Sequence, residues 1–344
     1  MSRKFFFIIL VTFFKICFCY VEIPSQFRDA KSPMASEFNL DIIQMNFPGL
    51  YDDVFAGIEG RIAGGVAADA RQFPYQGLMY MVDNKNATFI CGGSLITHSF
   101  LLTAAHCLYQ FEEISVFLGV TNRVSGPAAF SQDITDKSHI IMHNLYNPTG
   151  HVNDIGLIYL STLTAEHFDN KRISLITLPT RNDIDVNLVG MEATVAGFGS
   201  TSDTNKASEI LRYVTMPIIK NSMCKMTFGT FIKATNLCMS GQGGRSVCSG
   251  DSGSPLTVEL LPGKIVQVGI VSFGHKHGCT LGHPGVFTRV TSYLDWIEGH
   301  VGKMTIEGAI NNSPNTTDSN KNSAKCVHSL NIFSILLLII FKFF

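Results

Sequence analysis

The segment that decides the fold of this chain reads Gly250-Asp251-Ser252-Gly253-Ser254-Pro255. A serine enclosed by glycines is by itself a weak signal, because such a turn also occurs where no chemistry takes place. Two segments upstream give it more weight, namely Leu102-Thr103-Ala104-Ala105-His106-Cys107 and Asn153-Asp154-Ile155-Gly156-Leu157. A histidine, an aspartate and a serine therefore follow one another along the chain in that order.

These segments resemble the motifs of the chymotrypsin-like (trypsin-type) serine peptidase family, and the match covers Ile62 to about Val301. The resemblance implies an all-β fold with two six-stranded antiparallel β-barrels packed together and a C-terminal helix. It also implies a serine endopeptidase, a hydrolase that forms an acyl-enzyme. The catalytic residues would be His106, Asp154 and Ser252, and the N–H groups of Gly250 and Ser252 would form the oxyanion hole.

The chemistry of the three side chains explains why these residue types are needed. A serine hydroxyl is a poor nucleophile at neutral pH and requires a neighbouring base. His106 is suited to that role because the ordinary pKa of an imidazole lies near the working range. Asp154 would hold the imidazole tautomer and stabilise the imidazolium that forms. Taken singly, His106 is equally well a core histidine and Asp154 a turn residue, but the combination favours catalysis.

The bulk properties and the apolar pattern agree with an extracellular all-β protein. The chain has 344 residues and a formal net charge of -1, which gives no electrostatic case for binding nucleic acid. Short apolar runs separated by Gly, Pro, Asn and Asp indicate a barrel or a sandwich; examples are residues 77–82, 114–118, 193–196 and 265–271. A helix is predicted over 291–301, with Thr291 or Ser292 as its cap.

The N-terminal region is interpreted as two segments that precede the peptidase domain, which spans residues 62–301. Residues 1–19 have a basic start and a short apolar run, which indicate a secretory signal peptide; a membrane-spanning helix is the alternative, but the run is short for one. Residues 20–61 show no clear period and are expected to be a pro-segment.

The resemblance also implies an activation switch at the end of the pro-segment. A cut after Arg61 would create a new N-terminus at Ile62, and its ammonium would pair with the carboxylate of Asp251. A buried carboxylate beside the nucleophile requires such a partner, and the pairing would order the segment around Gly250. Arg61 as an ordinary surface residue is the alternative. Because the expected specificity is apolar, we expect a trypsin-like protease to make the cut.

Nine cysteines are present, and two of them lie in the signal segment. In an oxidising compartment the even set in the middle of the chain indicates three disulfides rather than a metal site. The resemblance pairs them as Cys91 with Cys107, Cys224 with Cys238, and Cys248 with Cys279. Cys326 is left over. Val120 stands where trypsin-type members begin a calcium loop, so neither a metal nor any other cofactor is expected.

Six residues are implied to form the substrate site, namely Ser246, Val247, Ser272, Phe273, Gly274 and Gly285, of which Ser272 and Phe273 match the strand that binds the substrate backbone. Ser246, at the expected floor, is uncharged, so a substrate cation would lose its hydration without gaining a countercharge. The expected preference is therefore for a large apolar residue on the acyl side, unless an acidic residue elsewhere lines the pocket. The expected mouth is ringed by His275, Lys276, His277 and His283, which either form a solvated loop or favour acidic substrates.

The C-terminal part combines a polar linker, residues 302–329, with an apolar tail, residues 330–344. This pattern resembles a lipid-anchor attachment signal; a tail retained in the membrane and a tail with neither role are the alternatives. Sequons at Asn86, Asn311 and Asn315 predict glycosylation.

The expected partners are protein or peptide substrates, the activating protease and protein protease inhibitors. The competing function is a catalytically silent binding protein on the same fold.

Overall fold

The structure is a computed structural model, and it describes residues 64–161, 163–203 and 206–302. The expected signal peptide, pro-segment, linker and tail lie outside the described residues, as do Arg61, Ile62, Asn311 and Asn315. Within the described ranges, no helix is both long and apolar enough to cross a membrane.

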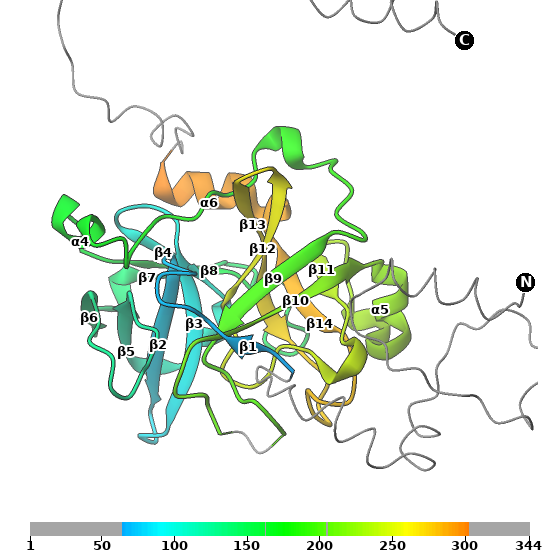
Figure 1. Cartoon of the computed structure of the whole chain (residues 1–344), viewed down its shortest axis with the longest axis horizontal. Helices are drawn as coiled ribbons and strands as arrows, with labels where there is room; N and C mark the ends of the chain where they lie inside the picture. The colour runs from blue at the N-terminus through cyan, green and yellow to red at the C-terminus, as the bar shows by residue number, and fades with distance from the viewer. Residues whose placement is uncertain (1–63, 162, 204–205, 303–344) are drawn as a thin grey trace, which may run out of the picture.

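The first half of the domain is an antiparallel sheet in the order β6-β5-β2-β3-β4-β8-β7, which curves into a half-barrel (Figure 1). Its strands are β2 (Gln76–Asp83), β3 (Thr88–Leu95), β4 (Phe100–Thr103), β5 (Phe111–Leu118), β6 (Phe130–Ile134), β7 (Ile140–Met142) and β8 (Gly156–Tyr159). In β5, Ile114, Val116 and Leu118 are buried while the residues between them are less so. This alternation is what a strand with one face on the core produces.

The second half forms a closed barrel, because β9 pairs with both β10 and β12. Its strands are β9 (Glu192–Gly197), β10 (Arg212–Ile219), β11 (Asn236–Met239), β12 (Pro255–Leu261), β13 (Lys264–Phe273) and β14 (Gly285–Arg289), and β1 (Val66–Ala67) pairs with β10 from outside. Six strands close the barrel in the order β9-β10-β11-β14-β13-β12. The all-β prediction of two packed barrels is therefore confirmed, with the first one open.

The predicted C-terminal helix is present as α6 (Leu294–Val301), preceded by a 3-10 turn over Val290–Tyr293. The expected cap was wrong, because Tyr293 precedes the first helical residue and no side chain caps it. Leu294 and Ile297 are buried in the core of the first barrel, although they follow the second barrel in the chain. The helix thus ties the two halves together (Figure 1).

Short helices that the sequence pattern did not predict connect the strands. They are α4 (Ala165–Asp169), α5 (Asn221–Phe228) and 3-10 turns at Ala105–Cys107, Lys137–His139, Arg181–Asp183, Gly229–Phe231 and Gln242–Gly244. The turn at Ala105–Cys107 holds His106, one of the expected catalytic residues, shortly after β4.

The structure contains the three expected disulfides, Cys91–Cys107, Cys224–Cys238 and Cys248–Cys279. Cys91–Cys107 lies in the core of the first barrel beside His106. Cys224–Cys238 joins α5 to β11, and both of its residues are fully buried. Cys248–Cys279 connects the segment before Ser252 to the segment after β13.

Replacing both Cys224 and Cys238 by alanine is expected to lower the free energy of unfolding by about 3 kcal/mol, because the bond closes a short loop in the unfolded chain. Urea denaturation in a Ser252→Ala background, which prevents self-digestion, measures the change. The native pair in that same background is the control. A loss below about 0.5 kcal/mol would show that the closure of this loop does not stabilise the domain.

Candidate active site

His106 and Asp154 are held together by two hydrogen bonds. The backbone N–H of His106 donates to Asp154 Oδ1 over 2.9 Å, and His106 Nδ1 lies 2.8 Å from Asp154 Oδ2. The first bond fixes the backbone position of the histidine and the second fixes the orientation of its ring. The imidazole therefore directs its Nε2 away from the carboxylate.

Asp154 is completely buried just before β8, and its polar atoms are satisfied by both halves of the domain. Ser272 on β13 donates to Asp154 Oδ2 over 2.5 Å. Thr288 on β14 donates from Oγ1 to the backbone oxygen of Asp154 over 2.8 Å. A buried carboxylate is costly unless it is paired and hydrogen-bonded, and Asp154 has both kinds of partner.

The two groups shift each other's titration in opposite directions. Burial alone would lower the pKa of the His106 imidazole, but the charge of Asp154 and the hydrogen bond to it raise that pKa above its ordinary value. Burial alone would raise the pKa of the Asp154 carboxyl, but the charge of His106 and the hydrogen bonds from His106 and Ser272 lower it well below its ordinary range. The pair is thus poised to stabilise a proton on the imidazole.

Ser252 lies on a turn that packs against the segment leading to His106. The backbone oxygen of Ser252 accepts a hydrogen bond from the N–H of Gly92 over 2.7 Å. At Gly253, where φ is +79°, a β-carbon would come within 2.2 Å of Thr103 Oγ1, so only glycine permits this approach. Among the described residues the hydroxyl makes no direct hydrogen bond with His106; such contacts are often long before substrate binds.

Gly250 and Ser252 supply two backbone N–H groups beside the hydroxyl. Gly250 has a φ of +96°, and a β-carbon there would lie 3.0 Å from the α-carbon of Gly199. Within the described part of the chain, neither N–H takes part in a backbone hydrogen bond. Two free donors next to a serine are what a developing oxyanion needs.

Asp251 is the second fully buried carboxylate of the site. It accepts hydrogen bonds from the N–H groups of Gly199 and Cys248, both over 2.9 Å. Burial raises the pKa of its carboxyl to about 7, although these two hydrogen bonds act in the opposite direction. No cationic side chain in the described ranges forms an ion pair with it.

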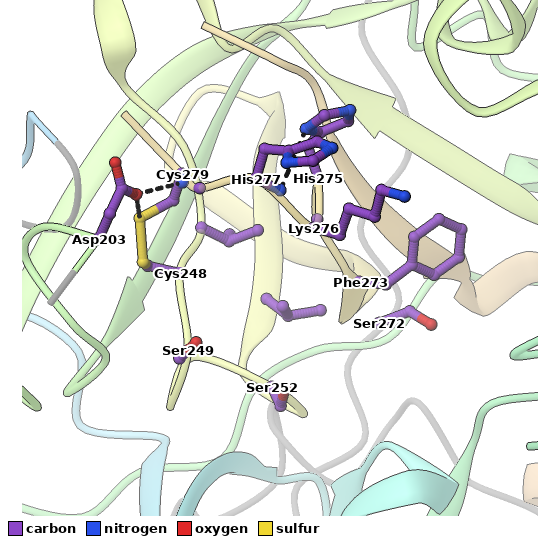
Figure 2. A pocket seen from close by; sticks show the side chains of 14 residues that line it. Asp203, Cys248, Ser249, Ser252, Ser272, Phe273, His275, Lys276, His277 and Cys279 are labelled. Atoms are coloured by element: carbon purple, nitrogen blue, oxygen red, sulfur yellow. Dashed lines mark hydrogen bonds between the residues drawn. A yellow bond between two sulfur atoms is a disulfide. The ribbon is translucent and has the colours of Figure 1, made fainter. Parts of the chain in front are cut away.

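A pocket of about 330 Å³ opens beside Ser252 (Figure 2). Four of the six residues expected to shape it are in its lining, namely Val247, Ser272, Phe273 and Gly274. Ser246 and Gly285 are not in the lining: both are buried, and a β-carbon on Gly285 would lie 3.5 Å from Ser246 Oγ. The expected floor residue is therefore covered rather than exposed to the cavity.

The rim of the pocket carries an acidic residue that sequence reasoning missed. Asp203 lies beyond the Cys248–Cys279 disulfide (Figure 2), and it accepts a hydrogen bond from the N–H of Cys279 over 2.7 Å and one from the hydroxyl of Thr280. These bonds lower the pKa of its carboxyl, with the Thr280 hydroxyl contributing most. No motif marks this residue, because its partners follow it by more than seventy positions.

The basic residues expected at the mouth lie close together. His275, Lys276 and His277 line the pocket (Figure 2). The ring of His283 stacks on that of His275 with centroids 3.8 Å apart. Burial lowers the pKa of the His275 imidazole, and the neighbouring positive groups lower it further. The mouth of the pocket is therefore a region of accumulated basic groups.

Comparison with known proteins agrees with this geometry. The model of the Trypsin family matches residues 62–297. The collagenase of Hypoderma lineatum is 35% identical over 251 residues, 72% of this chain and 90% of that protein. The chymotrypsin of Phaedon cochleariae is 38% identical over 70% of this chain and 82% of its own length, and the brachyurin of Leptuca pugilator is 37% identical over 70% and 99%.

A solved structure of HL collagenase superposes with a TM-score of 0.61 at 33% sequence identity, covering 69% of this chain and 97% of that one. At this level of identity and coverage, the similarity extends beyond the general fold.

The coupling between His106 and Asp154 predicts how His106 titrates. In a Ser252→Ala background we expect its pKa to lie above the ordinary 6.5 of an imidazole. In Asp154→Asn the raising influences disappear while burial remains, so the pKa should fall below the ordinary value. NMR of the histidine ring across pH 4–9 measures both. Asp133→Asn, on the exposed strand β6, is the control; equal titration in Asp154→Asn and in the control would contradict the coupling.

Proposed function

This chain belongs to the trypsin family of serine peptidases and is a serine endopeptidase, and from this premise we propose that it is a secreted precursor, activated by a cut after Arg61, that hydrolyses peptide bonds after large apolar residues. The observation that carries the proposal is the hydrogen-bonded pair of His106 and Asp154 beside the turn of Ser252, next to a pocket with Val247 in its wall.

The proposed reaction uses each group of the site in turn. The Ser252 oxygen bonds to the peptide carbonyl carbon while its proton passes to His106 Nε2. The negative charge moves to the carbonyl oxygen, where the N–H groups of Gly250 and Ser252 stabilise it. The C–N bond then breaks, and the imidazolium returns the proton to the leaving amine. Water attacks the acyl-enzyme by the same route and releases the acid and the hydroxyl.

The proposed preference for large apolar residues rests on the composition of the pocket. Val247 gives it an apolar wall, and a β-carbon at Gly274 would meet nothing closer than the backbone oxygen of Val247 at 3.8 Å. The space in front of Gly274 is therefore open to a substrate side chain. A lysine or arginine side chain would enter without meeting a free carboxylate at the buried end, and that is unfavourable.

Replacing Gly274 by valine should narrow the pocket and reverse its preference. We expect kcat/KM for a peptide with phenylalanine on the acyl side to fall about 100-fold, while kcat/KM for the matching alanine peptide changes little. Both peptides are assayed on the trypsin-activated full chain. The ratio of the two values is the quantity tested, because it is insensitive to the fraction of active enzyme.

The same assay with arginine on the acyl side tests the alternative, in which Asp203 serves as the countercharge for a basic substrate. In that case the arginine peptide would be cleaved at least as well as the phenylalanine peptide, and Asp203→Asn would abolish cleavage of the arginine peptide. An arginine preference that Asp203→Asn removes would overturn the proposed specificity.

The proposed activation is supported by the state of Asp251 in the uncut chain. Its carboxylate is buried and has a pKa of about 7, and its hydrogen-bond donors among the described residues are two backbone N–H groups. An ammonium at Ile62 would supply the missing countercharge. The two N–H donors come from Gly199 and from Cys248, which lies in the pocket wall. The pairing of Asp251 with the Ile62 ammonium would therefore fix the position of the pocket wall as well as that of the segment around Gly250.

The activation proposal has a pH signature in stability. In the uncut chain the pKa of Asp251 is raised from 3.8 to about 7. The contribution of this group to the free energy of unfolding is therefore fully present below pH 3.8, and it is lost as the pH rises through 7. After the cut, pairing should lower that pKa and reverse the trend. The Tm of cut minus uncut Ser252→Ala protein should therefore increase between pH 4 and 7. A difference that is flat with pH would count against an Asp251–Ile62 pair.

The remaining parts of the proposal concern the regions around the domain. Residues 1–19 are proposed as the signal peptide and 20–61 as the pro-segment, and three disulfides support an oxidising destination. Asn86 lies exposed in the turn between β2 and β3, which suits a glycan. Attachment to the cell surface through residues 330–344 is tested by the mass of the mature C-terminus.

A further inference from the structure

His151 is a second histidine beside the catalytic carboxylate, and the proposed reaction assigns it no role. Its Nδ1 lies 3.7 Å from Asp154 Oδ2, and its ring centroid lies 5.6 Å from that of His106. One face of its ring packs on Phe273, with centroids 5.4 Å apart. Two imidazoles therefore converge on one carboxylate from different directions.

The loop that carries His151 holds it in this position. His151 and Asn153 both have left-handed backbone, with φ of 48° and 56°, which non-glycine residues seldom adopt. The hydroxyl of Tyr293 donates to Asn153 Oδ1 over 2.9 Å, and Asn153 donates to the backbone oxygen of Leu145. Such a backbone conformation is kept only where the surrounding contacts enforce it, and it is common at functional sites.

The Nδ1 atom of His151 has an unusual environment. It is shut off from solvent and has no hydrogen-bond partner, because Asp154 Oδ2 is beyond hydrogen-bond distance. A buried polar atom without a partner costs about 1–3 kcal/mol. A cation placed between this nitrogen and the carboxylate would satisfy it.

Two other groups of metal-ligating side chains have comparable spacing, but each contains a disulfide. Cys91 and Cys107 lie near His106, and Cys248 and Cys279 lie near Asp203. Oxidised sulfur is not available as a thiolate ligand. Among the described residues, the group of His106, His151 and Asp154 is thus the one whose ligand atoms are all free to bind a metal, and they lie within 4.8 Å of one another.

We propose that His106 Nδ1, His151 Nδ1 and Asp154 Oδ2 bind a zinc ion that inhibits the enzyme reversibly. Imidazole nitrogen and carboxylate oxygen are ordinary zinc ligands, and at bond lengths of about 2.1 Å two tetrahedral ligands stand about 3.4 Å apart. The observed separations from Oδ2 are 2.8 Å to His106 and 3.7 Å to His151, so small side-chain rotations suffice.

The surroundings of these atoms suit a metal. Ser272 already donates a hydrogen bond to Asp154 Oδ2. Carboxylates that bind metals are commonly held in orientation by such hydrogen bonds. The side chains of His106 and His151 are 22% and 35% exposed, so the ring rotations that zinc binding requires also open the enclosed Nδ1 of His151 to solvent. The fourth position would hold water.

Inhibition follows from the tautomer of His106. Zinc takes the electron pair of Nδ1, and the neutral ring must then carry its proton on Nε2. Nε2 is the atom that accepts the Ser252 proton in the proposed reaction, so the metal-bound ring is no longer a base. This step rests on the proposed function, whereas the binding of zinc does not.

The binding test uses the uncut full chain in a Ser252→Ala background, without a polyhistidine tag. Competition with a chromophoric chelator should detect one tightly bound zinc, and His151→Asn should weaken it by about 100-fold or more. Asparagine is chosen because it tolerates left-handed backbone, and circular dichroism verifies the fold. No competition, or equal affinity in the His151→Asn variant, would overturn the site.

The inhibition test uses the trypsin-activated chain and a peptide substrate. Zinc should inhibit in the concentration range where it binds, a chelator should restore the rate, and the inhibition constant should rise at least about 100-fold in His151→Asn, each variant measured against its own uninhibited rate.

The matched control is His277→Asn, which changes a histidine of the pocket mouth that also lines the cavity. If His277→Asn abolished the inhibition and His151→Asn did not, zinc would act at the mouth and the proposal would be wrong. Zinc that binds without inhibiting would overturn the tautomer argument while leaving the site. An activated chain that cleaves no peptide would refute the proposed function alone, since the chelator measurement needs no activity.

Discussion

The carboxylate of Asp154 is the point at which the two halves of the domain meet. It is fully buried, and it accepts hydrogen bonds from His106 in the first half and from Ser272 in the second. The backbone of the same residue accepts from Thr288. Removing one charge or one donor from such a buried group leaves the others without a partner, which costs far more than any surface contact. The relative position of the two halves is therefore linked to the position of His106, the proposed base.

Further buried hydrogen bonds join the two halves of the domain and fix their relative position. Gln76 on β2 donates to Ser254 Oγ over 3.1 Å, and Ser94 on β3 donates to Gln267 on β13 over 2.7 Å. The Gly92 N–H bonds to the Ser252 oxygen nearby. Polar contacts have strict geometry, whereas apolar packing tolerates sliding. The serine turn is consequently positioned by both sheets rather than by its own loop.

The parts of the fold that depend on local pattern could be predicted from the sequence, and those that depend on distant partners could not. A short apolar run over residues 114–118 predicted a strand where β5 lies, and the spacing of Leu294, Ile297 and Val301 on one face predicted α6. His106, Asp154 and Ser252 could be proposed as catalytic residues because each lies in a recognisable segment. His151 and Asp203 were missed as site residues because their partners lie elsewhere and no motif surrounds them. The covered position of Ser246 was missed because the lining of a cavity depends on packing between segments distant in sequence.

Asp154 and Asp251 are two fully buried carboxylates in one site, yet their pKa values move in opposite directions. Burial acts on both in the same sense, so the difference lies in their partners. Asp154 faces an imidazole that can carry charge, while the partners of Asp251 in the described part of the chain are two backbone N–H groups. An uncompensated carboxylate is the strongest acceptor in its surroundings for any cation that arrives later.

The backbone of Asp251 donates to Cys248, and its oxygen accepts from Ser254. A displacement of the Asp251 side chain would therefore also move the backbone of the segment that contains Gly250 and Ser252. One buried carboxylate of the site is thus satisfied and holds His106 in place. The other has no cationic partner among the described residues, and under the proposed activation a new charge there would act directly on the segment of Gly250 and Ser252.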